Sequence, residues 1–138
     1  MYEGEGMMKY VMSFIMILLI SFPAMTADTP EETELIALRM YADWCGKCRT
    51  LDPKVDEVKE EFRGKGVLFA VFDQTDEFAQ EQSILHARLL GLEHIQKEFG
   101  GMTGLLLLID PETKEIMERI THTVSADEIR NKIQTKLN

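Results

Sequence analysis

The apolar residues of this chain fall into short runs and longer helical periods that alternate along the sequence. Three runs are bounded by turn residues and are short enough to be strands: residues 35–42 (LIALRMYA), 67–73 (VLFAVFD) and 104–110 (GLLLLID). We expect the second run to be a buried strand and the third a central strand. Residues 116–123 alternate apolar and polar positions, which is typical of a half-solvated antiparallel strand.

Helical periods fill the intervals between these runs. Ser125, with Glu128 three residues later, predicts a capping box for the last helix, and residues 93–99 form a shorter helical piece closed by glycine. The apolar positions that recur at helical spacing are Leu51, Val55, Val58 and Phe62, then Phe78, Leu85 and Leu89, then Ile129, Ile133 and Leu137. The predicted order is βαβαββα, which indicates an α/β fold with a central mixed sheet of about four strands flanked by helices.

Length and charge limit what this domain does. The chain has 138 residues with 45% hydrophobic content, enough for one domain with one core. Its formal net charge of -9 argues against nucleic acid or anionic lipid as a partner, because no basic patch stands out. We expect proteins to be the partners and the chain to be a monomer.

The N-terminus differs in composition from the rest. Lys9 precedes an apolar run over residues 10–22, which is shorter than the roughly 18 to 20 residues of a membrane-spanning helix. We therefore interpret residues 1–27 as a secretory signal peptide, with an uncleaved membrane anchor as the alternative. Residues 28–34 are then a polar leader and residues 35–138 the folded domain. The expected location is periplasmic or secreted, or membrane-anchored and facing the periplasm.

The two cysteines are the candidate chemistry. Cys45 falls where the first strand ends and a helix begins, so backbone N–H groups and the helix dipole stabilise its thiolate. Such positions lower a cysteine pKa from about 8.5 to roughly 3.5 to 7.5. Cys48 lies one turn further along and is expected to be more buried. Position therefore predicts that Cys45 is the nucleophile and that Cys48 resolves the mixed disulfide.

Other uses of this pair stay open. A zinc site needs about four ligands, and the only histidines, His86, His94 and His122, have no ligand spacing. We expect no metal site and no cofactor beyond the redox-active pair itself. The alternatives are a redox-inert protein-binding module and a carrier that holds a thiophilic metal ion between Cys45 and Cys48.

The segment around the pair resembles the active site of the thioredoxin-like family. The residues that carry the resemblance are Ala42, Trp44, Cys45, Gly46, Cys48 and Pro53. Pro53 stands where the family has a helix proline, and we expect Trp44 to form part of the docking surface. The resemblance implies a thioredoxin-like fold and a thiol-disulfide oxidoreductase acting on protein thiols and disulfides. It also implies a redox recycling partner and leaves the direction of electron flow open.

Three positions depart from the family pattern. Thr103 stands where the family has a cis-proline, and we expect the Met102–Thr103 peptide bond to be trans or strained because a cis bond before a non-proline residue is costly. Arg39 replaces a buried acid. If its charge lies beneath the cysteines it would favour thiolate and a stronger oxidant, whereas pairing with a surface carboxylate would cancel that effect. Lys47 replaces proline and adds a cation between the two sulfurs.

Overall fold

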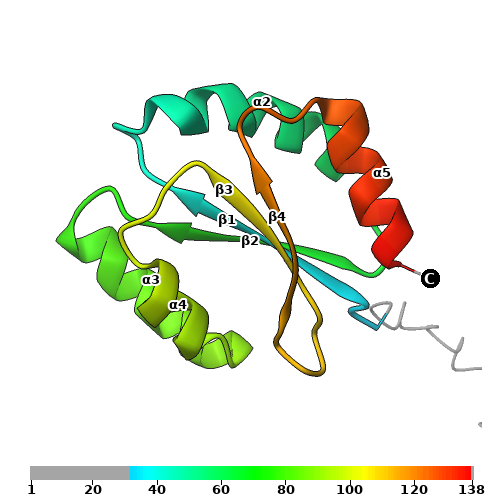
Figure 1. The fold of residues 1–138 in the computed structure, drawn as a ribbon. Helices are drawn as coiled ribbons and strands as arrows, with labels where there is room; N and C mark the ends of the chain where they lie inside the picture. The colour runs from blue at the N-terminus through cyan, green and yellow to red at the C-terminus, as the bar shows by residue number, and fades with distance from the viewer. Residues whose placement is uncertain (1–31, 138) are drawn as a thin grey trace, which may run out of the picture.

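A computed structural model describes residues 32–137 as four strands and four helices (Figure 1). The expected signal peptide or anchor, residues 1–27, lies outside the described residues. The strands are β1 (Leu35–Tyr41), β2 (Val67–Asp73), β3 (Leu105–Ile109) and β4 (Ile116–Thr121). The helices are α2 (Gly46–Glu61), α3 (Glu77–Leu90), α4 (Glu93–Phe99) and α5 (Ala126–Lys136).

The strands form one mixed sheet in the order β2-β1-β3-β4. Strand β1 runs parallel to β2 and antiparallel to β3, and β3 runs antiparallel to β4. Helices α2 and α5 cover one face of the sheet, and α3 and α4 cover the other (Figure 1). The predicted fold class and element order are confirmed, with residues 77–99 forming two helices.

Alternation along β1 divides the core between the two faces. Leu35 and Ala37 pack with the apolar positions of α2 and α5, whereas Ile36, Leu38 and Met40 pack with those of α3 and α4. Because both faces of β1 are covered by helices, its sequence is a nearly continuous apolar run. The carboxyl end of β1 leads directly into the cysteine segment, so the best-packed strand of the sheet positions the candidate site.

Residues 67–73 form the predicted strand, but the prediction that this strand is buried is wrong. Strand β2 lies at the edge of the sheet, and of its residues only Phe72 is fully buried. Leu68 and Val71 remain partly exposed. An apolar run does not distinguish a central strand from an edge strand, because helices pack against both kinds of strand. The two differ in whether the strand forms hydrogen bonds to neighbouring strands on both sides or on one side only.

The apolar period of α3 is also placed differently from the expectation. Helix α3 buries Ser83 and Ala87, while Phe78, Leu85 and Leu89 are exposed. The Ser83 hydroxyl donates to the carbonyl oxygen of Asp73 at 2.9 Å and accepts from the Asp73 backbone N–H at 2.7 Å. These small side chains let the helix approach β2 closely, so hydrogen bonding to the sheet edge decides which face of α3 is buried.

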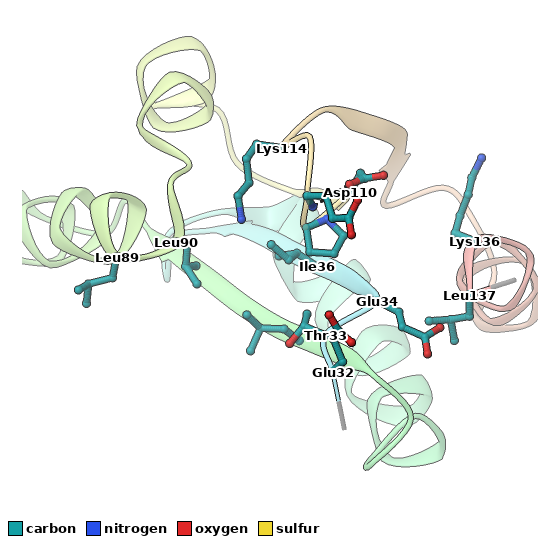
Figure 2. A pocket seen from close by; sticks show the side chains of 13 residues that line it. Glu32, Thr33, Glu34, Ile36, Leu89, Leu90, Asp110, Lys114, Lys136 and Leu137 are labelled. Atoms are coloured by element: carbon teal, nitrogen blue, oxygen red, sulfur yellow. Dashed lines mark hydrogen bonds between the residues drawn. The ribbon is translucent and has the colours of Figure 1, made fainter. Parts of the chain in front are cut away.

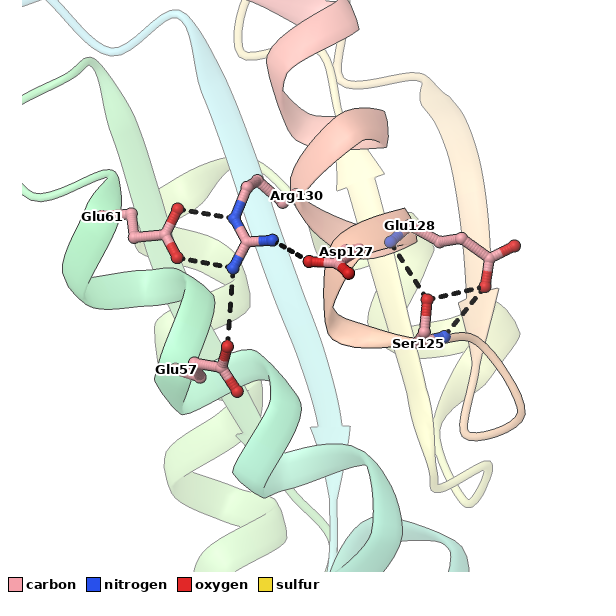
Figure 3. A network of polar contacts seen from close by, with 6 residues as sticks. All are labelled: Glu57, Glu61, Ser125, Asp127, Glu128 and Arg130. Carbon is pink, nitrogen blue, oxygen red and sulfur yellow. Dashed lines mark hydrogen bonds and ion pairs between the residues drawn. The ribbon is translucent and has the colours of Figure 1, made fainter.

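Helix α5 begins at the predicted capping box and is tied to α2 by one arginine. The Ser125 hydroxyl accepts from the backbone N–H of Glu128, and the Glu128 carboxylate accepts from the Ser125 backbone N–H. Arg130 donates to both carboxylate oxygens of Glu61 at 2.6 Å and also contacts Asp127 (Figure 3). Within residues 32–137, no helix has the length and apolarity needed to cross a bilayer.

Candidate active site

Cys45 caps the N-terminus of α2. Its backbone is extended, with φ -82° and ψ 108°, and its sulfur accepts a hydrogen bond from the Cys48 backbone N–H at 3.1 Å. A sulfur in this position takes the place of the oxygen of an ordinary N-cap residue and satisfies one of the free N–H groups of the first turn. Both cysteines are reduced and buried, with 5% of Cys45 and 1% of Cys48 exposed.

The pKa of the Cys45 thiol is lowered by its hydrogen bonds. Burial alone would raise this pKa, but hydrogen bonds to the Cys48 and Thr103 side chains and to the backbone of Cys48 and Lys47 outweigh burial. These bonds favour the thiolate because a charged sulfur accepts them more strongly than a neutral one. Cys45 is therefore the more acidic of the two thiols, as the helix-start position predicts.

The Cys48 thiol is shifted in the opposite direction. Burial raises the pKa of Cys48 to about 11, with further increases from its hydrogen bond to Cys45 and from the charges of Cys45 and Asp52. The Cys48 thiol donates to the Met40 carbonyl oxygen across 3.8 Å. The Cys45 thiol thus ionises more readily than its neighbour, and Cys48 keeps its proton to higher pH, which is the asymmetry that a nucleophile and a resolving thiol require.

A groove joins the cysteine segment to the loop before β3. It has a volume of about 490 Å³ and brings together most of the predicted site residues: Trp44, Cys45, Gly46, Lys47, Met102 and Thr103. No peptide bond between residues 32 and 137 is cis, so the Met102–Thr103 bond is trans, one of the two expected states. Arg39 and Pro53 do not line this groove, and Pro53 is an exposed residue within α2.

Gly104 permits the loop to approach the helix. Its φ is +75°, and a Cβ added at Gly104 would lie 2.5 Å from the Cβ of Lys47. The Gly104 backbone N–H also donates to the Met40 carbonyl oxygen at 2.9 Å. Because only glycine fits both the backbone conformation and the space, Gly104 holds Thr103 against Cys45. Residue spacing did not reveal this role of Gly104. The "TGLL" junction between a loop and a strand is the sequence feature that indicates it.

The loop after β2 holds Trp44. The indole Nε1–H donates to the Thr75 carbonyl oxygen at 3.0 Å, and the Thr75 hydroxyl accepts from the Asp43 backbone N–H at 3.0 Å. Asp73 accepts from the backbone N–H and the hydroxyl of Thr75. Trp44 is nevertheless exposed beside the groove, a placement consistent with the docking role predicted for it. Thr75 and Asp73 are positioning residues that sequence spacing did not reveal.

Arg39 is paired with carboxylates of α2. Its Nη1 lies 3.3 Å from an Asp52 oxygen and 3.4 Å from an Asp56 oxygen, and 19% of its side chain is exposed. These carboxylates offset its charge, which corresponds to the ion-paired alternative of the two sequence interpretations. Burial raises the pKa of Asp52 despite the opposing effect of Arg39.

Asp52 was missed at the sequence level although it acts on the Cys48 thiol. Its negative charge raises the pKa of Cys48. The signal for it is helical spacing, because a residue four positions after Cys48 lies on the same side of α2. Lys47 contributes to the thiolate through its backbone N–H, and its side chain is exposed to solvent. Among residues 32–137, no group of three or more His, Cys, Asp or Glu side chains is placed to hold a metal ion.

Several known proteins are similar to this chain. The thioredoxin family model matches residues 21–86. Thioredoxin-T of Drosophila melanogaster is 33% identical over 54 residues, which make up 38% of this chain and 34% of that protein. Protein disulfide isomerase-like 1-4 of Arabidopsis thaliana is 34% identical over 59 residues, 41% of this chain and 10% of that protein. The matches thus span 34% and 10% of the length of these two relatives.

The fold has solved counterparts. A thiol:disulfide interchange protein of the thioredoxin family from Chlorobium tepidum TLS superposes with a TM-score of 0.55 at 16% identity, covering 78% of this chain and 82% of that one. At this identity the likeness concerns the fold. The four-stranded mixed sheet with helices on both faces is therefore a thioredoxin fold.

Proposed function

We propose that this chain is a member of the thioredoxin-like family and a thiol-disulfide oxidoreductase that exchanges disulfides with protein substrates; the thioredoxin family model that matches residues 21–86 supports this proposal. Cys45 is the nucleophile and Cys48 the resolving thiol. No bound cofactor takes part, because the cysteine pair itself carries the two electrons. We propose this activity for this chain alone, because the chain matches only part of the length of its relatives.

The reaction starts from the Cys45 thiolate. This sulfur attacks one sulfur of a substrate disulfide, so that a mixed disulfide forms and the other substrate sulfur leaves as a thiolate. Cys48 then loses its proton and attacks the Cys45 sulfur, which releases the second substrate sulfur. The protein ends with a Cys45–Cys48 disulfide and the substrate with two thiols. The same steps in reverse oxidise a substrate dithiol.

One observation carries the proposal: the opposite pKa shifts of two adjacent sulfurs. The pKa of Cys45 is lowered, and that of Cys48 is raised to about 11. A pair that only packs in the core has no need of a thiolate, and a carrier of a thiophilic ion binds it best with both sulfurs ionised. The asymmetry supports sequential attack and resolution, and the exposed groove beside Cys45 supports entry of an extended polypeptide segment.

The test uses a protein disulfide and serine variants of the pair. We expect the wild-type protein with a dithiol reductant to reduce insulin, and Cys45→Ser to abolish that activity. Cys48→Ser is the matched variant: it retains the nucleophile and should accumulate a mixed disulfide with the substrate. A wild-type protein that neither turns over nor forms mixed disulfides supports the redox-inert binding module. One that retains stoichiometric metal after purification supports the metal carrier.

We further propose that the domain works outside the cytoplasm, released after cleavage of residues 1–27 or held by them as an anchor. Cell fractionation combined with N-terminal sequencing of the purified chain tests this assignment. A chain that stays in the cytoplasm with residues 1–27 intact would contradict it.

The direction of electron flow follows from the reduction potential of the cysteine pair. We expect a potential between about -270 mV, the value of thioredoxin, and about -120 mV, the value found in strong oxidants; a value near the upper limit would mean that this protein acts as an oxidant. Equilibration with glutathione measures it. A potential at or below about -270 mV would mean that this protein acts as a reductant. The redox partner that recycles the cysteine pair must have a reduction potential suited to the measured value.

A further inference from the structure

Helix α3 turns its most apolar side chains away from the domain. The exposed fractions are 71% for Phe78, 48% for Leu85 and 84% for Leu89. At 100° per residue these three side chains, here named the α3 face, fall within an arc of about 40°. The side that α3 buries, at Ser83 and Ala87, lies on the opposite side of the helix. A stripe of large apolar groups in solvent marks an interaction surface.

Exposed apolar residues are concentrated here. Within residues 32–137, the large exposed hydrophobic side chains outside the cysteine groove are all on β2 or α3: Leu68, Val71, Phe78, Ile84, Leu85 and Leu89. Leu68 and Leu89 line one hollow of about 950 Å³ at the end of β1 opposite to Cys45. Figure 2 shows Leu89 at the outer rim of this hollow and Leu90 nearer to Ile36. The α3 face thus continues onto the sheet edge, and none of its three residues lines the cysteine groove.

The charges beside the α3 face change sign along the helix. Glu81 lies in its first half and Arg88 in its last turn, about 40° and 60° from Leu85 on the same side. Both side chains are exposed, and neither forms an ion pair within residues 32–137. When two copies of such a helix lie antiparallel, the acidic end of one flank lies beside the basic end of the other. The flank is therefore complementary in charge to a second copy of itself.

An antiparallel pairing of two α3 helices satisfies both features at once. With a two-fold axis between Ser83 and Ile84, Phe78 of one copy lies level with Leu89 of the other. Glu81 then lies two residues, about 3 Å along the axis, from the level of Arg88 in the second copy. A two-fold axis repeats each contact, so each copy supplies one acidic and one basic end. The chain as a whole carries a charge of -9, so opposite charges at this face are what permits two copies to approach.

We propose that two copies of this chain associate through the α3 face in this antiparallel register, in place of the monomer expected from the sequence. The dimer uses no residue of the cysteine groove, so it is independent of the proposed oxidoreductase activity.

Sedimentation equilibrium of the full chain as purified, under reducing conditions that exclude intermolecular disulfides, tests the proposal. We expect a dimer with a micromolar dissociation constant and at least a tenfold weakening in Leu89→Glu, since this variant places a carboxylate in the contact. Arg63→Glu, a charge reversal at an exposed site after α2, is the matched control and should leave the constant unchanged. Activity per chain should be the same in Leu89→Glu.

Charge reversal tests the register. Glu81→Arg and Arg88→Glu should each weaken the dimer by about tenfold, because each variant places like charges together twice in the symmetric pair. The double variant restores opposite charges and should regain most of the wild-type affinity. A wild-type chain that is monomeric at high micromolar concentration overturns the proposal, whether another protein or residues 1–31 cover the face. If each single variant weakens the dimer and the double variant does not regain affinity, the antiparallel register is wrong.

Discussion

Replacing Gly104 with alanine should disturb both the fold and the Cys45 thiol. Two effects add at this position. A residue with a side chain at φ +75° is strained by about 1 to 2 kcal/mol. The new Cβ would also lie 2.5 Å from the Cβ of Lys47, closer than carbon atoms approach, and overpacking of this kind costs about 1 to 3 kcal/mol. We expect Gly104→Ala to lower the free energy of unfolding by about 2 to 5 kcal/mol.

Gly64→Ala separates the two effects. Gly64 has nearly the same backbone angle, φ +72°, and nothing within 4 Å of an added Cβ. It should therefore show the strain alone, about 1 to 2 kcal/mol. Urea unfolding followed by circular dichroism measures both variants, and the difference between them reports the contact with Lys47.

The same substitution has a chemical consequence. Relief of the contact moves the loop that carries Thr103 away from α2, and hydrogen bonding to the Thr103 side chain helps to lower the pKa of Cys45. The rate of Cys45 alkylation as a function of pH should therefore shift to higher pH in Gly104→Ala and stay unchanged in Gly64→Ala. Equal destabilisation of the two variants, or an unshifted profile in Gly104→Ala, would refute the role assigned to Gly104.

Three further predictions concern the interior. Asp52→Asn should lower the pKa of Cys48 from about 11 by a minor part of its shift, measured by thiolate absorbance, because burial and Cys45 contribute more; an increase would contradict the charge assignment. The unfolded Cys48 thiol ionises near its ordinary value of 9.0 whereas the folded one keeps its proton to about 11, so the reduced protein should lose about 3 kcal/mol of stability as pH rises through that window. Chemical unfolding at several pH values should show this loss in the wild type and not in Cys48→Ala. Leu51→Ala should lower the free energy of unfolding in urea by about 2 to 5 kcal/mol, because Leu51 is fully buried. Arg130→Gln should lower it less, because the ion pairs of Arg130 are on the surface. A larger loss in Arg130→Gln than in Leu51→Ala would be inconsistent with this core.

Local sequence patterns were sufficient for the elements and for the position of the cysteine pair. The capping box at Ser125 and the helical period from Leu51 to Phe62 depend on residues close in the chain, and both are present in the structure. The position of Cys45 at the start of α2 likewise follows from a strand that ends and a helix that begins nearby. Such features are predictable because their energetics are local.

Features that depend on long-range packing were not predictable. The apolar run of β2 lies at a sheet edge because β1 pairs with β3 on its other side, which no local pattern indicates. The face that α3 buries is decided by hydrogen bonds between Ser83 and Asp73 rather than by the larger apolar side chains. The pairing of Arg39 with Asp52 likewise joins residues of different elements.

The pH titration of the two thiols in the reduced protein is the most direct measurement of the central claim. Thiolate absorbance, with Cys45→Ser and Cys48→Ser to assign each step, should show the Cys45 step below the ordinary cysteine value of 9.0 and the Cys48 step near about 11. A single unshifted step for both sulfurs, or a Cys45 step above that of Cys48, would contradict the assignment of Cys45 as the nucleophile and of this chain as an oxidoreductase.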